Sequence, residues 1–342
     1  MPSSRRVVVF GLGGTIAMAG TEPGGVPDLS PEQLLAAVPA LAGTGIEVAT
    51  VDFRRAPGAW LRFQDLYELA AAIEAVPEPD GVVVTQGTDT IEETSYLLDL
   101  LLRRSAPVVV TGAMRNPQLT GPDGPANLLA AVQVAGSDQA RDQGVVVVFN
   151  DEIHPARRVR KTHATNVATF QSPNGGPLGY VVEGETWFVN RLPDRTPVPV
   201  ATPDPPPRVG LVTLALGDDG LLLDAVAGRV DGLVVAALGA GHAPDWLVDR
   251  LAGLAGRIPV VLGSRTGAGP VLAATYEFAG SERDLRQRGL IGAGLLDPPK
   301  ARILLWALLA AGADRATIVD AFAVAGGYAS ADRWPYPAGS SR

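Results

Sequence analysis

Short apolar runs alternate with helical patterns along most of the chain, and this alternation sets a tight limit on the fold. The runs are rich in β-branched residues and lie at 7–11, 81–85, 107–111, 144–149, 209–216, 232–237 and 258–263. Patterns typical of helices lie between them, at 30–42, 63–76, 90–104, 125–136, 244–256 and 298–311. Strands that are apolar almost throughout are typical of a parallel sheet covered on both faces. The sequence therefore predicts an α/β protein.

A proline-rich interval interrupts this pattern. Residues 192–207 read LPDRTPVPVATPDPPP, with seven prolines in sixteen positions. Such a composition favours an extended, semi-rigid linker. We therefore expect a parallel-sheet N-terminal domain over residues 1–191, a linker over 192–207, and a smaller α/β C-terminal domain over 208–342.

Composition excludes several classes of partner. The net charge of −8 gives no electrostatic support to binding of nucleic acid or of an anionic membrane. The chain has no cysteine, which excludes disulfides and Cys-ligated metal sites. The apolar run near the N-terminus is too short for a signal peptide, and no segment of membrane-spanning length is free of glycine and charge. A cytoplasmic protein is expected.

A polar turn follows the apolar run 81–85. It reads Gln86-Gly87-Thr88-Asp89 and places a hydroxyl and a carboxylate at the carboxyl end of a strand, where α/β proteins bind ligands. Thr90 is expected to open the next helix in a capping box with Glu93, as Ser30 does with Gln33 at the start of 30–42. The alternative is an ordinary loop with Thr and Asp as turn formers.

The first strand ends in a second glycine-rich turn, GLGGTIA at 11–17. As a dinucleotide fingerprint it is incomplete, because Ile16 stands where the third glycine belongs and a loop-like segment follows. A nicotinamide-dependent dehydrogenase therefore remains as an alternative. The other interpretation is a turn that exposes the Thr15 hydroxyl next to backbone N–H groups able to stabilise an oxyanion.

A threonine nucleophile needs a base, and one lysine is a candidate. Of the 28 basic residues only two are lysines, Lys161 and Lys300. Because lysine, unlike arginine, can give up its proton in a protein, a lysine in so arginine-rich a chain is a candidate for chemistry. Asp89 could orient Lys161. The alternative is a solvated basic loop around 157–161.

Together these segments resemble the bacterial-type asparaginase/glutaminase family, the two-threonine amidohydrolases. The stretches that carry the resemblance run in order through most of the chain, at 13–17, 87–94, 111–115, 156–179 and 300–302. The resemblance implies hydrolysis of the side-chain amide of L-asparagine to L-aspartate and ammonia, through a threonine acyl-enzyme and without a metal or an organic cofactor. It also implies a homotetramer, a dimer of dimers, with active sites between protomers.

The resemblance assigns roles to individual residues. Thr15 would be the nucleophile, and Lys161 would be the proton acceptor of a second arm formed with Thr88 and Asp89. Backbone N–H groups of Thr15 and Thr88 would form the oxyanion hole, and Asp89 would bind the substrate's ammonium group. Further contacts to the small amino-acid substrate would come from Gly14, Gly87 and Ala113. His242, Tyr276 and Glu277 are candidates to complete a neighbouring protomer's site.

Two departures from the family pattern concern the substrate. The serine that usually binds its carboxylate is absent, and Ala59 and Trp60 are the best candidates for that position. The lid usually carries a tyrosine, whereas Thr21 is the only hydroxyl in the Gly/Pro-rich segment 20–27. Two alternatives therefore stay open. One is an amidase with relaxed or shifted preference, for glutamine, D-asparagine or a peptidyl amide; the other is a non-catalytic amino-acid sensor.

Overall fold

The computed structural model describes residues 5–18, 29–192 and 195–336 and forms two compact units. The division between the units falls between Arg195 and Thr196, inside the proline-rich interval. The predicted lid residue Thr21 lies outside the described residues. Among the described residues, no helix has the length and apolar character needed to cross a membrane.

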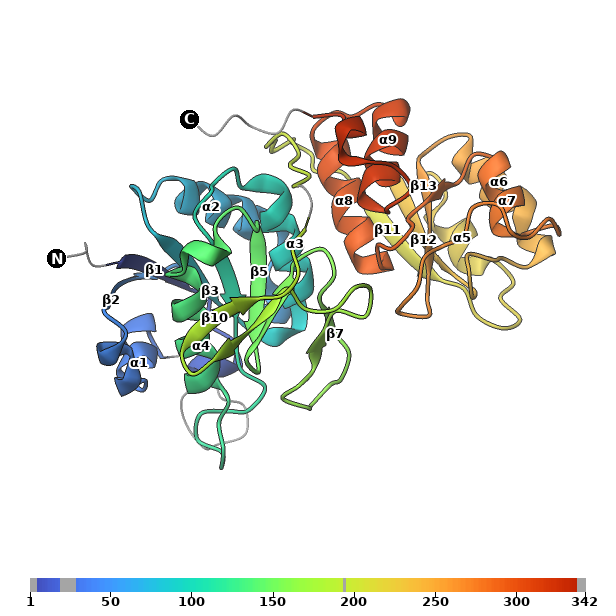
Figure 1. Cartoon of the computed structure of the whole chain (residues 1–342). Coiled ribbons are helices and arrows are strands. Elements are labelled where there is room, and N and C mark those ends of the chain that lie inside the picture. Colours follow the sequence, from blue (N-terminus) through green and yellow to red (C-terminus); the bar gives the residue numbers. More distant parts are fainter. Residues whose placement is uncertain (1–4, 19–28, 193–194, 337–342) are drawn as a thin grey trace. The chain divides into compact units, whose positions relative to one another are not determined.

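The first unit is built on an eight-stranded sheet in the order β10-β9-β6-β5-β4-β3-β1-β2 (Figure 1). Its strands are β1 (Arg5–Gly11), β2 (Ile46–Asp52), β3 (Gly81–Thr85), β4 (Val108–Thr111), β5 (Val145–Phe149), β6 (Glu152–Pro155), β9 (Gly179–Val182) and β10 (Glu185–Phe188). The first five are parallel, which confirms the predicted parallel sheet. The last three extend it antiparallel, because the tight turn at Asn150 and Asp151 reverses the chain after β5.

Helices cover this sheet and account for the continuous apolar runs. They are α1 (Pro31–Ala36), α2 (Phe63–Glu74), α3 (Ile91–Leu101) and α4 (Gly124–Ala135). Val7, Val9, Val83 and Val109 form one buried cluster with Leu34 of α1, Leu128 of α4 and neighbouring residues. The alternate residues of β1, β3 and β4 are buried as well. Burial on both faces is why these strands lack a polar alternation.

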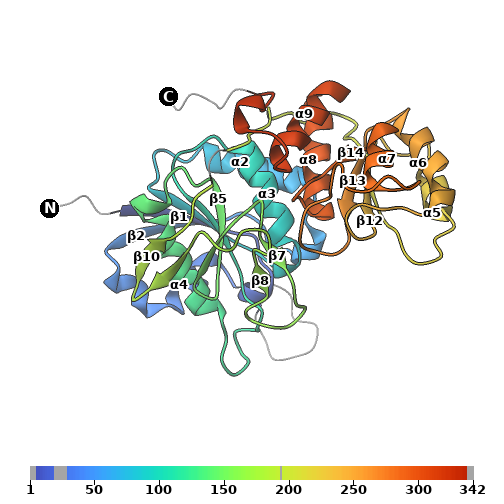
Figure 2. The same cartoon turned by 45° about the vertical axis from the view of Figure 1, so that its right-hand side comes forward.

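Short 3-10 turns and one small hairpin complete the first unit. The described turns of the first unit are η1 (Thr15–Ala17), η2 (Pro39–Gly43), η3 (Gly58–Trp60), η4 (Thr88–Thr90) and η5 (Asp138–Ala140). Those of the second unit are η6 (Asp245–Leu247) and η7 (Ala331–Arg333). The hairpin pairs β7 (Arg160–Lys161) with β8 (Phe170–Gln171) and lies beside α3 (Figure 2). It carries the predicted base, Lys161.

The two expected capping boxes have different outcomes. Ser30 caps α1 with Gln33 as predicted, with Pro31 in the first turn. Thr90 directly precedes α3 as predicted, but the prediction of its capping box with Glu93 is wrong. Its hydroxyl donates to the carbonyl oxygen of Gly58, 3.0 Å away, so this side chain joins two loops rather than closing the end of α3.

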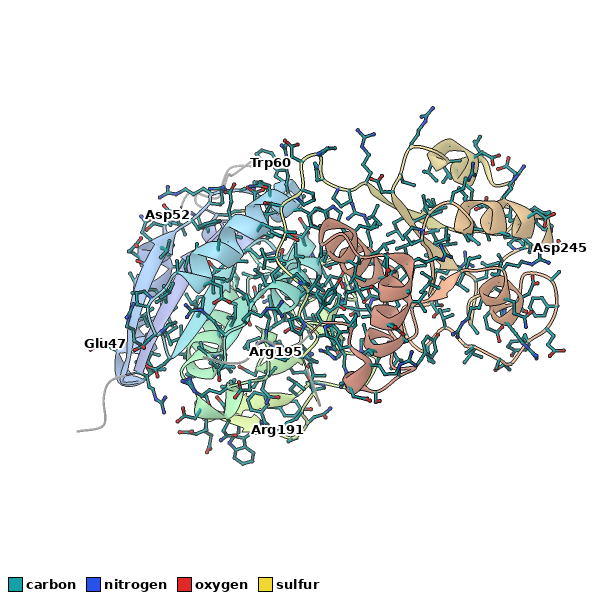
Figure 3. The ribbon with its side chains drawn as sticks, turned by 90° about the horizontal axis from the view of Figure 1, so that it is seen from above. Glu47, Asp52, Trp60, Arg191, Arg195 and Asp245 are labelled. Carbon is teal, nitrogen blue, oxygen red and sulfur yellow. The ribbon has the colours of Figure 1, made fainter. Side chains whose placement is uncertain are left out.

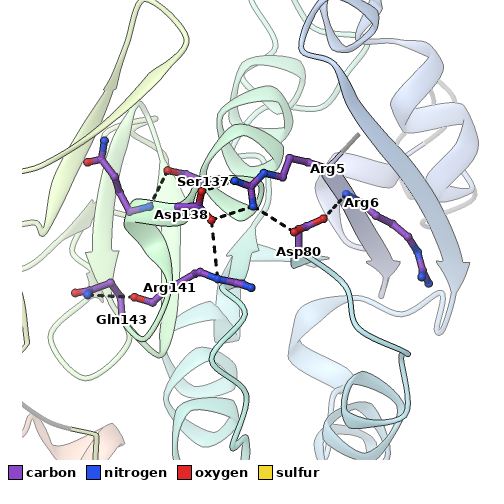
Figure 4. Close-up of polar contacts among 8 residues, drawn as sticks. Arg5, Arg6, Asp80, Ser137, Asp138, Arg141 and Gln143 are labelled. Atoms are coloured by element: carbon purple, nitrogen blue, oxygen red, sulfur yellow. Dashed lines mark hydrogen bonds and ion pairs between the residues drawn. The ribbon is translucent and has the colours of Figure 1, made fainter. Parts of the chain in front are cut away.

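Ion pairs hold the amino ends of β1 and β3. The Arg5 guanidinium lies 3.3 Å from Asp80 Oδ1 and 2.9 Å from Asp138 Oδ1, and Asp80 accepts a hydrogen bond from the Arg6 backbone N–H at 2.8 Å (Figure 4). These charges lie at the edge of the sheet opposite to the carboxyl ends of the parallel strands.

The second unit repeats the α/β plan at smaller size. Its four strands are parallel, in the order β11 (Val209–Thr213), β12 (Gly232–Ala237), β13 (Val260–Ser264) and β14 (Ile291–Gly292). Its helices are α5 (Leu221–Val226), α6 (Val248–Ala255), α7 (Glu282–Gln287), α8 (Pro298–Ala310) and α9 (Arg315–Ala325). It has its own apolar core, in which residues of β12 and β13 pack with residues of α6.

Candidate active site

The candidate site forms where four parallel strands end together. The register pairs Gly11 of β1 with Asp52 of β2 and with Thr85 of β3, and Thr85 pairs with Thr111 of β4. The turns that follow these strands therefore leave the same edge of the sheet. This edge is the ordinary ligand position of an open α/β sheet, and it gathers segments that lie up to one hundred residues apart in the sequence.

Three glycines let these turns approach one another closely. Gly14 has a φ of 84°, and a Cβ built on it would lie 2.1 Å from the backbone nitrogen of Gly87. A Cβ built on Gly87 would lie 2.7 Å from the backbone nitrogen of Gly58. A side chain at Gly14 or Gly87 would push the turns apart. The half-buried Thr15 is thus held next to the Gly87–Thr88 turn.

Lys161 joins this edge from another part of the chain. Its Nζ donates to Thr88 Oγ1 at 2.9 Å and lies 3.0 Å from Asp89 Oδ1. The Thr88 residue is 6% exposed, and the side chains of Lys161 and Asp89 are 16% and 62% exposed. The hydroxyl is thus shielded from water while the carboxylate faces solvent. An amine that contacts both can exchange a proton with the hydroxyl while the carboxylate fixes its position.

The backbone of Lys161 is held by a residue that sequence reasoning missed. The Lys161 N–H donates to Glu92 Oε2, 3.3 Å away in the first turn of α3. Glu92 lies four residues after Thr88, at the start of the helix that follows the Thr88–Thr90 turn, and this nearness in sequence was the available signal. The start of α3 therefore positions both the proposed base, Lys161, and the Thr88 hydroxyl.

The predicted substrate contacts differ in their surroundings. Ala113 is buried, 1% exposed, and follows β4 at the same edge. Ala59 and Trp60 lie in η3 and are exposed, Trp60 by 70%. Trp60 is at the margin of the first unit (Figure 3). The backbone of η3 packs against the Gly87 turn, while the Trp60 side chain is largely exposed to solvent. Neither Ala59 nor Trp60 supplies a hydroxyl in place of the family's serine.

The second unit holds a separate group around His242. Its Nε2 lies 3.3 Å from Oε2 of the buried Glu282, and its ring meets the half-exposed Tyr276 edge to face at 5.0 Å. Glu282 Oε1 accepts from the backbone N–H of Thr275 and of Tyr276 at 2.8 and 3.0 Å. These hydrogen bonds lower the pKa of Glu282 against the opposing effect of burial. Sequence reasoning named His242 and Tyr276 but missed Glu282.

The geometry does not support the dinucleotide interpretation. Thr15–Ala17 forms a single 3-10 turn, and Met18 is already extended, whereas the fingerprint requires an α-helix directly after the glycines. Within the described ranges, no group of three His, Cys, Asp or Glu side chains is placed to hold a metal ion.

Comparisons with known proteins match both units of this chain to asparaginases. The family model "Asparaginase, N-terminal" matches residues 6–194, and the model "Glutaminase/Asparaginase C-terminal domain" matches residues 208–322. A probable L-asparaginase of Deinococcus radiodurans is 38% identical over 93% of this chain and 97% of its own length. An L-asparaginase of Bacillus licheniformis is 34% identical over 90% and 96%. The crystal structure of a probable cytoplasmic L-asparaginase from Campylobacter jejuni superposes with a TM-score of 0.82 at 32% identity, covering 93% of this chain and 99% of that one.

Proposed function

The chain belongs to the asparaginase/glutaminase family, and on that premise we propose that it hydrolyses the side-chain amide of L-asparagine to L-aspartate and ammonia. One observation carries the proposal: Lys161 Nζ lies 2.9 Å from the Thr88 hydroxyl and 3.0 Å from the Asp89 carboxylate. These groups share an edge of the sheet with the Gly14-Thr15 turn. A hydroxyl, an amine and a carboxylate in contact are the parts that amide hydrolysis needs.

The proposed reaction has two stages, and Thr15 is the nucleophile. Its hydroxyl oxygen attacks the amide carbon and loses its proton, and the nitrogen of the substrate gains a proton and leaves as ammonia. Backbone N–H groups of Thr15 and Thr88 stabilise the negative charge on the carbonyl oxygen. Water then attacks the resulting ester, which releases aspartate and returns the proton to Thr15. Thr88, Lys161 and Asp89 form the arm that moves protons, with Lys161 as acceptor.

Recognition of the α-amino acid requires one partner for its ammonium group and another for its carboxylate. We assign the substrate's ammonium group to the Asp89 carboxylate, and the exposure of this side chain supports the assignment. The carboxylate end has no serine hydroxyl at Ala59 or Trp60, and such a hydrogen bond to a charged group is worth roughly 1.5–3 kcal/mol. A second candidate function follows from this difference: the same chemistry on glutamine, D-asparagine or a peptidyl amide.

Ammonia release tests the proposal. We expect wild-type protein to release ammonia from L-asparagine and Thr15→Ala to lose at least about a thousandfold of kcat, since the nucleophile is gone. Ser137→Ala, next to Asp138 at the amino-end edge of the sheet, is the matched hydroxyl control and should keep the wild-type rate. Equal rates for wild type and Thr15→Ala would refute the mechanism. Tight asparagine binding without turnover by wild type would favour the sensor instead.

Relative rates on the four amides decide the substrate. L-Asparagine should have the highest kcat/KM. A higher value for glutamine, D-asparagine or a peptidyl amide would select the second candidate function.

We further propose a cytoplasmic homotetramer in which His242, Tyr276 and Glu277 complete a neighbour's site. Support comes from the family and from the half-exposed Tyr276 ring beside His242. Mass measurement in solution at working concentration tests the assembly, and a fully active monomer would contradict it. Cell fractionation tests the location.

A further inference from the structure

Two side-chain contacts attach the hairpin that carries Lys161 to the main sheet. One is apolar: the ring of Phe170 in β8 lies 4.7 Å, centre to centre, from Phe149 at the end of β5. The other is polar: Ser172, directly after β8, has its Oγ 3.0 Å from His154 Nδ1. Both fastenings lie within two residues of Phe170, which is the register partner of Lys161.

His154 is a fully buried titratable group that the proposed reaction does not use. It lies in β6 opposite Val147 of β5, and its side chain is 0% exposed. Burial lowers the pKa of His154 to about 4, so the ring is neutral near pH 7 and its contact with Ser172 is a hydrogen bond between neutral groups. Its Nε2 lies 3.2 Å from Glu152 Oε2 without hydrogen-bond alignment. Because a buried polar group without a hydrogen bond is costly, the bond to Ser172 offsets part of the cost of burying this ring.

We propose that His154 and Ser172 are positioning residues for the amide hydrolysis proposed above: their hydrogen bond fixes the β7–β8 hairpin so that Lys161 Nζ stays between Thr88 and Asp89. This inference rests on the proposed function, because it takes Lys161 as the base. It assigns no contact with substrate to either residue.

The path from Ser172 to Lys161 is short and made of rigid contacts. Gln171 pairs with Arg160 and Phe170 pairs with Lys161. The Thr162 N–H donates to the Thr169 carbonyl oxygen at 2.8 Å and closes the ladder on the other side. A displacement of Ser172 is therefore passed to the Lys161 backbone. Since a 1 Å misplacement of a reacting group can lower a rate by about a hundredfold, loss of this fastening should be visible in kcat.

The variant Ser172→Ala removes only the hydroxyl and tests the inference most cleanly. We expect kcat for L-asparagine to fall about tenfold with KM unchanged within about twofold, because the base moves while the substrate contacts stay. His154→Leu should lower kcat by a similar factor. The double variant should be no worse than either single one, since both remove the same bond. His154→Asn, which keeps a polar atom near the position of Nδ1, should recover part of kcat.

A matched control separates positioning from general loss of stability. Thr44 is at the opposite edge of the sheet, where its hydroxyl donates to the Leu41 carbonyl oxygen at 2.7 Å. Thr44→Val should lower thermal stability about as much as Ser172→Ala and leave kcat at the wild-type value. If Ser172→Ala is equally destabilised but keeps kcat within about twofold, the positioning role is wrong. Additive losses in the double variant would also overturn it.

Lys161→Met distinguishes failure of this inference from failure of the proposed function. If Lys161→Met is inactive while Ser172→Ala is unimpaired, only the positioning role fails. If Lys161→Met keeps the wild-type kcat, the proposed base is wrong and the positioning role falls with it. Circular dichroism of each variant confirms that the compared proteins are folded, and His154→Asn provides a second folded comparison if His154→Leu does not fold.

Discussion

Asp89 combines two proposed tasks in one carboxylate, and its exposure makes them separable. Its Oδ1 lies 3.0 Å from Lys161 Nζ, while 62% of the side chain remains open to solvent and substrate. A neutral amide at this position keeps the size of the group but removes the charge that attracts both ammonium groups.

We predict that Asp89→Asn lowers kcat/KM for L-asparagine by at least about a hundredfold, because a charged hydrogen bond to the substrate and one to Lys161 both weaken. Succinamic acid, which lacks the α-ammonium group, is the discriminating substrate. The ratio of wild-type to variant kcat/KM should be smaller for succinamic acid than for asparagine. Equal ratios for both substrates would show that Asp89 does not bind the ammonium group.

His154 also couples folding to pH, with a sign that can be worked out. Its pKa is about 4 in the folded chain, whereas an unfolded histidine titrates near 6.5. Between these values the unfolded chain binds more protons, so this residue's contribution to stability is present above pH 6.5 and is lost as pH falls toward 4. Glu152 opposes part of this loss, since burial raises its pKa.

We predict that wild type loses roughly 3 kcal/mol of unfolding free energy through His154 between pH 6.5 and pH 4, before the opposing effect of Glu152. His154→Leu should give a flatter stability profile over this range, and Thr44→Val should keep the wild-type slope. Urea unfolding at several pH values measures this. Parallel profiles for wild type and His154→Leu would contradict the prediction.

Among single residues, the sequence predicted a functional candidate where a residue type is rare in the chain. It did not predict contacts that only the tertiary fold creates. Lys161 is noticeable because lysine is so rare in this chain, and the structure places it beside the predicted Asp89. The bond between His154 and Ser172 joins β6 to the residue that follows β8, and no sequence pattern links these two positions. Only the fold brings them together.

Among the elements, the contact between the first and third βα turns matters most for the site. The Gly14 and Gly87 backbones pack so closely that neither position has space for a side chain. Gly14 also has a positive φ, which non-glycine residues adopt at a cost of about 1 kcal/mol or more.

We predict that Gly14→Ala abolishes activity and lowers the unfolding free energy by about 2 kcal/mol or more, because the new Cβ would lie 2.1 Å from a backbone atom. Gly43 provides the matched control: a Cβ there meets nothing within 4 Å. Gly43→Ala should leave activity and stability unchanged or slightly raised. A fully active Gly14→Ala would mean that the turns can separate without harm to the site.

The central parallel strands of the first unit were the most predictable elements, because each is an uninterrupted apolar run. The fully buried β3, β4 and β5 end within one residue of their apolar runs. The edge strand β2 was missed because it is largely exposed and its sequence, IEVATVD, alternates weakly. The helix expected at 30–42 ends at Ala36, since Pro39 disfavours helical geometry at Val38 and a 3-10 turn follows.

For the molecule as a whole, each unit has its own core and its own buried polar feature. In the second unit that feature is the other lysine of the chain. Lys300 is 0% exposed, and its Nζ lies 2.9 Å from Asp297 Oδ2. The other oxygen of this carboxylate caps α8 by accepting a hydrogen bond from the Lys300 backbone N–H. At this position the lysine therefore has a structural role.

Because α8 packs across β11, β12 and β13, the ion pair between Lys300 and Asp297 should affect the stability of the whole second unit. We predict that Lys300→Met lowers that unit's unfolding free energy by about 3 kcal/mol, since it leaves the Asp297 carboxylate buried without the ammonium. Hydrogen exchange of amides in β12 measures this, with amides in β3 of the first unit as internal reference. Adding Asp297→Ser, which retains a capping oxygen and removes the buried charge, should restore most of the loss. Equal loss of protection in β3 and β12 would show that the two units unfold as one, whereas no loss in either would show that the buried pair contributes little.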